Sequence, residues 1–352
     1  MRPALPAVAI AVAVALLAAA PAAPAAVRVS PVGVRPHGTL IVHVTGRLPQ
    51  TLSIDGRRLA TARKASTHVS LRSRIAQGRH RLRACRGRSC SASATFVVTN
   101  GPIVGDCPVL PPDSPWNTDV SSAPLAADSA TLVGAQAAGH DVHLDFGDTQ
   151  SEYGIPYALV GPRQRRVPIA FGTDGADYGD ESDHGPFPIP PTAPIEGAPA
   201  GQPDPQEGDR HVIVIQRERC VDYELYNAVR RGAGASWQVS SSARWDLTRN
   251  ARRAWQAPAS HCGTATDPST PPYGSRWRLK AAFAETPYSG PALAIVRALK
   301  RYGLIFADQG SSMFITGTTD RRWTTTIEDI NQRHPIPGDA FEVVAGPTPT
   351  PC

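Results

Sequence analysis

Proline is spaced too closely along this chain for long helices. The 352 residues include 35 prolines and 30 glycines, and a proline inside a helix removes a backbone hydrogen bond and clashes with the preceding turn. Helical bundles and coiled coils are therefore disfavoured. Apolar runs recur along the whole sequence, which also disfavours long disorder, and the length allows one or two domains with a sizeable core.

The first 25 residues are typical of an export signal. Arg2 is followed by an Ala/Val/Leu run and then by small residues, and cleavage after Ala25 would satisfy the small-x-small rule. The alternative is an uncleaved membrane anchor, because the apolar stretch continues almost to Arg28. We expect cleavage, since Ala and Pro form a poor spanning helix. The sequence thus predicts a secreted, cell-wall-associated protein that meets the membrane only through its signal.

Cysteine usage agrees with export. All six cysteines follow the predicted signal, and an even number in an exported chain suggests disulfides. Cys85 and Cys90 flank a turn in an alternating segment, so we expect them to bridge a hairpin. The pairings that we favour for the others are Cys107 with Cys352 and Cys220 with Cys262. A metal site is the alternative, but no CxxC or HxxxH spacing supports it.

Positive charge is concentrated in residues 27–99. This segment has 14 Lys/Arg and a single acid, Asp55, giving +13, whereas residues 100–352 carry a net charge of −8. The division favours a hypothesis in which the basic segment holds an anionic envelope polymer by screened charge attraction. Nucleic acid is a poorer partner, because the segment lacks the interleaved aromatic residues that stack on bases.

Residues 27–99 also alternate between apolar and polar positions in short runs separated by turn signals such as Asp55-Gly56. This spacing predicts a small immunoglobulin-like β-sandwich. The segment resembles modules of that kind that precede another domain in secreted bacterial proteins.

Residues 103–352 are predicted to form one larger β-rich α+β domain, so that the whole chain is mainly β with a few helices. The expected strands are 142–146, 155–160, 166–171, 211–216, 222–226, 236–239, 276–281, 304–307 and 313–316. The expected helices are 127–138, 290–302 and 325–332. Eight prolines in residues 186–205 indicate an extended surface loop.

Residues 106–345 resemble a family of uncharacterised secreted proteins from high-GC bacteria. The matching segments include Pro115-Trp-Asn-Thr-Asp, His143-Leu-Asp-Phe-Gly, Tyr153-Gly-Ile-Pro-Tyr, Glu181-Ser-Asp-His-Gly-Pro, Gly208-Asp-Arg-His-Val, Tyr223-Glu-Leu-Tyr, Trp245-Asp-Leu, Pro271-Pro-Tyr-Gly-Ser-Arg-Trp and Ala307-Asp-Gln-Gly-Ser-Ser. The resemblance implies domain limits but no activity. Members of the family carry a longer insert before the histidine that matches His261, and its absence here would suit a degenerate binding form.

One group of candidate site residues lies on a single predicted strand. Asp141, His143 and Asp145 alternate with Val142 and Leu144, which places the three polar side chains on one strand face. Such a face could bind a sugar or a divalent metal. The alternative is a solvent-facing polar stripe on a half-buried strand.

Other candidates are acids in loops. Glu181 and Asp183 belong to an acidic stretch that ends at His184, where neighbouring carboxylates would raise one another's pKa. Asp308 follows an apolar strand and precedes a Gly/Ser turn, and His261 adjoins Cys262. If the domain is an enzyme, we expect a carboxylate mechanism drawing on Asp308, Glu181 and Asp183, with His261 transferring or orienting a proton.

Two binding residues complete the set. Trp116 lies outside the apolar strands and is the best exposed aromatic residue for stacking on a sugar. Arg210 precedes an apolar strand, and a pair with Glu224 across neighbouring strands is plausible, either purely for structure or in a site.

No nucleophile or cofactor motif (GxSxG, P-loop, GxGxxG or HExxH) is present in the sequence, and no cofactor is expected. Two function classes remain. The first is an enzyme that acts on an extracellular polysaccharide through carboxylate acid/base chemistry. The second is a non-catalytic protein that binds a polysaccharide or the cell surface.

Overall fold

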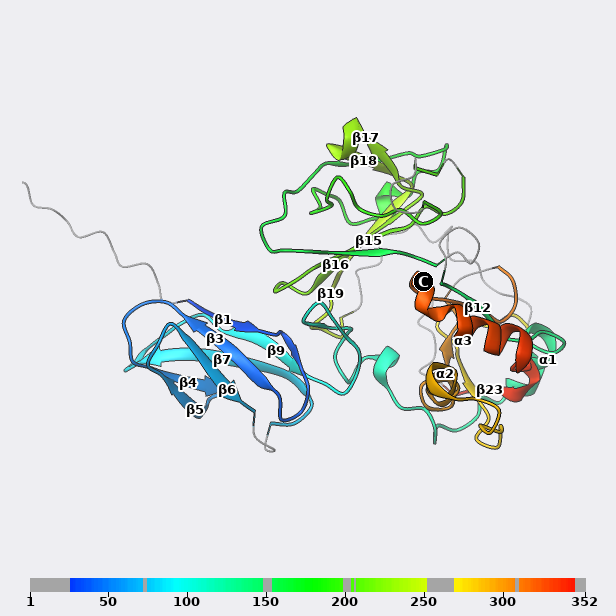
Figure 1. The fold of residues 1–352 in the computed structure, drawn as a ribbon, viewed down its shortest axis with the longest axis horizontal. Helices are drawn as coiled ribbons and strands as arrows, with labels where there is room; N and C mark the ends of the chain where they lie inside the picture. Colours follow the sequence, from blue (N-terminus) through cyan, green and yellow to red (C-terminus); the bar gives the residue numbers. More distant parts are fainter. Residues whose placement is uncertain are drawn as a thin grey trace, which may run out of the picture.

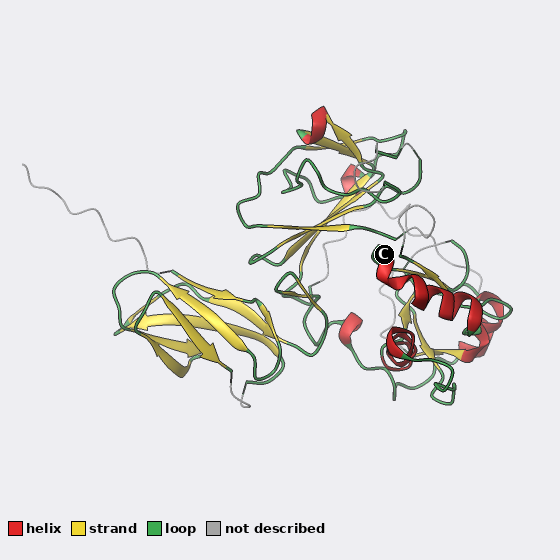
Figure 2. Cartoon of the chain, in the orientation of Figure 1, coloured by secondary structure: helices red, strands yellow, loops and turns green. Residues whose placement is uncertain are grey.

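The computed structural model describes residues 26–71, 75–147, 154–198, 204–205, 207–251, 269–307 and 310–345. These residues form a mainly β fold with a few helices, as the sequence predicts (Figures 1 and 2). The predicted signal lies outside them. Within the described ranges, no helix is both long enough and apolar enough to cross a membrane.

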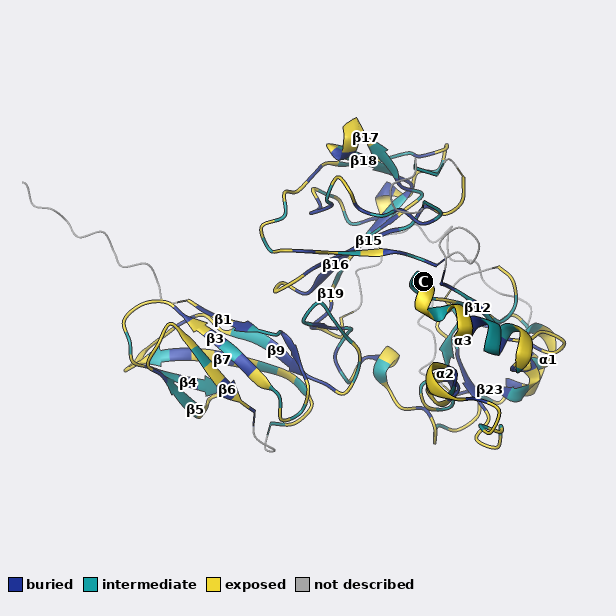
Figure 3. Ribbon diagram, viewed as in Figure 1, coloured by how far each residue is buried: buried dark blue, intermediate teal, exposed yellow. Residues whose placement is uncertain are grey.

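The N-terminal residues form the predicted β-sandwich. One sheet consists, in spatial order, of β1 (Val27–Ser30), β3 (Thr39–Val44) and β6 (Ser66–Ser70). The other consists of β2 (Gly33–Val34), β9 (Ala94–Val98), β7 (Gly78–Arg86), β4 (Gln50–Ile54) and β5 (Arg57–Ala62), with β8 (Ser89–Cys90) beside β7. Leu40, Leu52, Leu82 and Phe96 are fully buried between the sheets. Buried and exposed residues alternate along the strands (Figure 3).

The middle of the chain forms a second core between two further sheets, and we call this part the middle unit and its sheets the middle sheets. The first consists, in spatial order, of β13 (Tyr157–Val160), β15 (Val212–Gln216), β16 (Val221–Tyr226) and β19 (Ser241–Asp246). The second consists of β14 (Ile169–Phe171), β18 (Ser236–Val239) and β17 (Val229–Arg231). Tyr223 and Trp237 are buried in this core together with Phe187 and Ile189, which come from the proline-rich segment.

The third core is assembled from two separate parts of the chain. The elements that precede the middle sheets in the sequence are α1 (Ser129–Gln136) and β12 (His143–Asp145). The elements that follow the middle sheets are β20 (Arg276–Leu279), α2 (Gly290–Arg301), β21 (Leu304–Ile305), β22 (Phe314–Thr316), α3 (Thr324–Glu328) and β23 (Phe341–Val344). Strand β12 pairs in parallel with β22, and Val142 and Leu144 are buried with Trp277, Val296 and Ile330. We call this unit the C-terminal lobe.

The helix predictions are confirmed, with bounds shifted by a few residues. Helix α2 begins after Ser289, carries Pro291 in its first turn and ends at Arg301. Gly303 follows with a φ of 67°, and a side chain there would collide with the backbone of Trp277. The chain can therefore turn directly from α2 into β21.

Two disulfides join described cysteines. Cys85 and Cys90 are bonded across the β7–β8 hairpin, as predicted. The predicted partners of Cys107 and Cys220 are wrong, because these two residues are bonded to each other. Cys107 lies in β11 (Cys107–Pro108), and Cys220 lies just before β16. The pairing is set by the fold, which packs both beside Val32, Ile215 and Leu247. Cys262 and Cys352 lie outside the described residues.

Candidate functional site

The strand that carries Asp141, His143 and Asp145 has the predicted alternation. Val142 and Leu144 are buried, while the three polar residues are exposed or half-buried. His143 is held in place: its Nδ1 lies 3.3 Å from Asn331 Nδ2, and its ring lies 4.3 Å from the ring of Phe314. In the described part of the chain, no three His, Cys, Asp or Glu side chains are grouped so that they could hold a metal ion.

Carboxylates of the acidic loop, residues 174–184, help to hold that loop in place. Asp177 Oδ1 accepts a hydrogen bond from the backbone N–H of Gly179 at 2.9 Å. Asp183 Oδ2 accepts one from the N–H of Arg244 in β19 at 2.8 Å. Glu181 closes a short 3₁₀-helix, η2 (Gly179–Glu181). Glu181 and Asp183 therefore lie beside the middle sheets, whereas Asp141, His143 and Asp145 belong to the C-terminal lobe.

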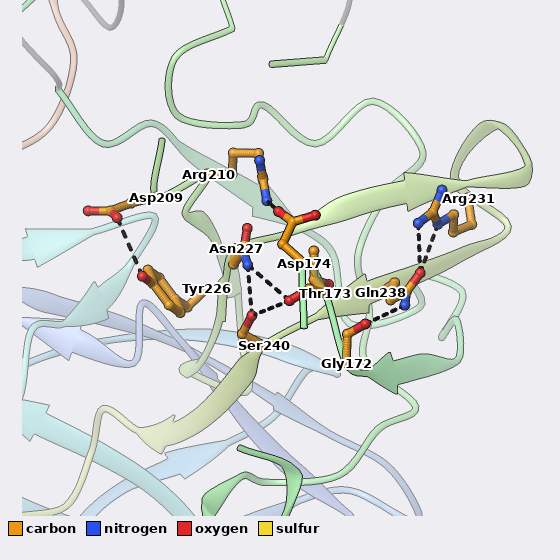
Figure 4. A network of polar contacts seen from close by, with 10 residues as sticks. All are labelled: Gly172, Thr173, Asp174, Asp209, Arg210, Tyr226, Asn227, Arg231, Gln238 and Ser240. Atoms are coloured by element: carbon orange, nitrogen blue, oxygen red, sulfur yellow. Dashed lines mark hydrogen bonds and ion pairs between the residues drawn. The ribbon is translucent and has the colours of Figure 1, made fainter. Parts of the chain in front are cut away.

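Arg210 does not pair with Glu224. The buried Arg210 side chain instead forms an ion pair with Asp174 of the acidic loop (Figure 4). Its backbone has a φ of 49°, which takes the residue out of the regular alternation that begins at Val212. The expected cross-strand pair is therefore wrong, and Arg210 anchors the loop.

A second set of contacts secures the same loop (Figure 4). Asn227 Nδ2 donates to Ser240 Oγ at 2.8 Å and to the Thr173 carbonyl at 3.4 Å. Tyr226 Oη also lies 3.5 Å from Asp209 Oδ1, next to Arg210, whose side chain holds Asp174 of the loop. The acidic loop is thus tied to the strands on both sides of the middle core.

The remaining predicted residues have different outcomes. Trp116, in η1 (Pro115–Asn117), is 58% exposed, as expected for a stacking residue. Asp308 and His261 lie outside the described residues, so the expected catalytic group of Asp308, Glu181, Asp183 and His261 stays a prediction.

The four-stranded sheet carries a pair of acids that sequence reasoning missed. Asp222 and Glu224 alternate with Val221, Tyr223 and Leu225 along β16, and the three apolar residues face the core. The two acids are alternate residues of one strand, so their side chains leave the same face of the sheet. Trp245 of β19 donates from Nε1 to Glu224 Oε2 at 3.0 Å.

Burial, followed by the negative charge of Glu224, raises the pKa of Asp222 to about 8. The low-dielectric surroundings disfavour the charged form, and a second negative charge nearby adds to that cost. The protonated, neutral form of Asp222 is therefore favoured at neutral pH. Such a pair of unlike environments is one way that proteins hold a proton ready for transfer.

The same sheet face continues toward His211. By register, His211 lies opposite Tyr226, and Ile213 and Ile215 lie opposite Glu224 and Asp222. His211 Nδ1 is 2.6 Å from Glu196 Oε2. Burial opposes the charged imidazole, but the hydrogen bond and charge of Glu196 prevail and raise its pKa.

An open cleft of about 680 Å³ begins at the edge of this face. Its lining comes from the middle sheet and from the C-terminal lobe: Pro156, Tyr157, Leu159, Pro291, Thr318, Thr319, Asp320, Arg322 and Trp323. Tyr157 and Leu159 are 41% and 43% exposed. Arg322 Nε donates to Asp320 Oδ1 at 2.9 Å, and these hydrogen bonds lower the pKa of Asp320 to about 2.

The cleft and the carboxyl pair share one sheet face. Tyr157 and Leu159 of β13 are in register with Ile213 and Ile215, which are themselves in register with Glu224 and Asp222. Two strand spacings separate β13 from β16, or about 10 Å. A ligand in the cleft would therefore lie close to the acids without touching Asp222.

Comparison with known proteins gave no family model that matches the chain and no similar curated protein. The site therefore has to be interpreted from its own residues. The signal that could have revealed the acid pair was present in Val221-Asp-Tyr-Glu-Leu-Tyr, where Asp222 and Glu224 have the spacing of one strand face.

Proposed function

We propose that this is a secreted, cell-envelope protein that binds an extracellular polysaccharide in the cleft between the middle sheet and the C-terminal lobe. The observation that carries the proposal is the lining of that cleft. Tyr157 and Trp323 supply aromatic surface, and the Asp320–Arg322 pair supplies charged hydrogen-bonding groups. Sites for small ligands and sugars combine apolar or aromatic walls with a few placed polar groups.

The disulfides support the extracellular part of this proposal. Bonds such as Cys85–Cys90 and Cys107–Cys220 form and persist in oxidising compartments. They agree with the export signal expected from the first 25 residues.

Carboxylate acid/base chemistry on the bound polymer is the second candidate, and the Asp222–Glu224 pair favours it. A glycosidase needs both carboxyl groups beside the scissile bond, about 5–10 Å apart. Asp222, however, is buried, which keeps its carboxyl group away from a bound polymer. This burial supports binding ahead of hydrolysis by these two residues.

The cleft variant Tyr157→Ala should weaken polysaccharide binding about fivefold to tenfold. It removes an exposed ring that we expect to stack on a sugar, and a tenfold loss corresponds to about 1.4 kcal/mol. Affinity for soluble β-glucan, xylan and polygalacturonate would be measured by titration calorimetry at neutral pH.

The control is Tyr273→Ala, which removes another exposed tyrosine outside the cleft lining and should leave affinity unchanged. Equal affinity in both variants would remove the cleft from the binding site. Turnover of any of these polymers, lost in Asp222→Asn or Asp308→Asn, would instead move the assignment to the enzymatic candidate.

A further inference from the structure

One outer surface of the N-terminal sandwich presents a row of arginines. Along β7, Leu82 and Ala84 are buried in the core, while Arg79, Arg81 and Arg83 are exposed on the opposite side. Alternate residues of a strand are about 6.7 Å apart. The three arginine side chains therefore leave the same side of β7 at regular intervals along the strand.

The neighbouring strands extend the row sideways. Arg83 lies opposite Ser53 of β4, and Ser53 lies opposite Arg58 of β5. Arg81 lies opposite Thr95 of β9. Ser53 thus separates Arg83 from Arg58, and Thr95 adjoins Arg81, while Arg79 lies opposite the buried Val97. All four arginines are themselves exposed. We call Arg58, Arg79, Arg81 and Arg83 the arginine face.

No acid neutralises this face. The module's single acid, Asp55, is occupied elsewhere: its Oδ2 is 2.7 Å from His80 Nδ1, and its Oδ1 accepts from the backbone N–H of Arg81 at 2.9 Å. Within the described ranges, the side-chain partners of the face are hydroxyls: Arg79 donates to Thr95 at 3.4 Å and Arg58 to Thr61 at 3.3 Å. Among the described residues, none of the four arginines forms an ion pair.

Like charges side by side on a sheet destabilise it, and an opposite charge brought by a ligand would remove that cost. Guanidinium groups suit oxyanions because their planar fork can donate two hydrogen bonds at once. Each arginine here is exposed and would bind a single anion weakly. Several arginines in a row bind a polymer of linked charges more tightly than a single anion, since the second and later contacts form within one complex.

We propose that the arginine face binds a linear acidic polysaccharide that carries a carboxylate on its repeating sugars. This inference rests on the proposed function, because it assigns to the polysaccharide a charge that the cleft alone does not require. Single-stranded nucleic acid fits the face less well. Phe96 is the only Phe, Tyr or Trp in residues 27–99, and it is fully buried, so no ring is available for stacking on bases.

The test uses the full chain and polygalacturonate of defined length. The triple variant Arg79→Gln/Arg81→Gln/Arg83→Gln should bind it at least about tenfold more weakly than wild type at 50 mM salt. Wild-type affinity should also fall steeply as salt rises, because binding releases counterions. In the triple variant the slope of log K against log salt should be smaller by about two to three.

The matched control changes three exposed arginines of the middle unit, Arg163→Gln/Arg165→Gln/Arg219→Gln, and so alters the net charge equally. It should keep wild-type affinity. Equal losses in the two triple variants would overturn the arginine face, as would wild type that does not bind polygalacturonate. Tighter binding of oligo(dT) or of anionic lipid vesicles than of polygalacturonate would also overturn it.

Neutral β-glucan separates this inference from the proposed function. The arginine triple variant should bind β-glucan as wild type does, whereas Tyr157→Ala should not. If Tyr157→Ala binds every polymer normally, the proposed function fails. If Tyr157→Ala loses affinity for polygalacturonate and the arginine triple variant keeps it, the cleft assignment stands and the arginine face fails.

Discussion

Replacing Asp222 by asparagine should stabilise the protein, and the gain should grow as the pH rises from about 4 to about 8. The folded-state pKa of Asp222 is raised to about 8 from an ordinary value of 3.8. Between these values, the folded protein holds a proton that the unfolded chain releases. The stability of wild type therefore falls through this window and stays low above it.

Asparagine cannot ionise, and it has nearly the same size and shape as protonated aspartic acid. One pKa unit corresponds to about 1.4 kcal/mol, so the shift sets an upper limit of about 6 kcal/mol. Local relaxation reduces such penalties, and we expect Asp222→Asn to be more stable by about 2–5 kcal/mol at pH 9 and nearly equal to wild type at pH 4. Thermal and urea unfolding across this pH range would measure the difference.

The control for this prediction is Glu218→Gln, an exposed carboxylate in the turn between β15 and β16. It should change stability little at any pH. A gain in Asp222→Asn that is the same at pH 4 and pH 9 would mean that ionisation of Asp222 does not govern the effect.

Removing the Cys107–Cys220 bond should cost about 5 kcal/mol of folding free energy. The bond joins residues 113 apart in sequence. A cross-link that closes so long a loop lowers the entropy of the unfolded chain by the equivalent of about 5 kcal/mol, against about 2 kcal/mol for a five-residue loop. The two cysteines are also fully buried beside Val32, Ile215 and Leu247. Urea unfolding of Cys107→Ala/Cys220→Ala, followed by tryptophan fluorescence, would measure the loss.

The second disulfide provides the comparison. Cys85 and Cys90 are five residues apart in an exposed hairpin, so Cys85→Ala/Cys90→Ala should lose about 2 kcal/mol. Similar losses in the two double variants would show that the long-range bond does not restrict the unfolded chain as expected.

Features with local causes were predictable from the sequence. The alternation in Val142–Phe146 identified β12, and the Ser-Gly-Pro start and glycine end identified α2. Cys85 and Cys90 were paired correctly because a hairpin brings them together. In contrast, β19 was missed since its sequence, Ser-Ser-Ala-Arg-Trp-Asp, is mostly polar.

Features that depend on the whole fold were not predictable in this way. Cys107 meets Cys220 only after β11 packs against the end of the four-stranded sheet. Arg210 meets Asp174 because a left-handed backbone residue interrupts the strand pattern. The raised pKa of Asp222 results from burial, which its strand spacing alone does not disclose.

The divided origin of the C-terminal lobe sets the order in which the chain can finish folding. Strand β12 pairs with β22, about 170 residues later in the chain, and the whole middle unit is made between them. During synthesis from the N-terminus, Val142, Leu144 and Phe146 are therefore made long before the strands and helices that cover them. The sandwich and the middle sheets can form first. The apolar side of β12 stays exposed to solvent, and so to aggregation and proteolysis, until the last part of the chain has been made.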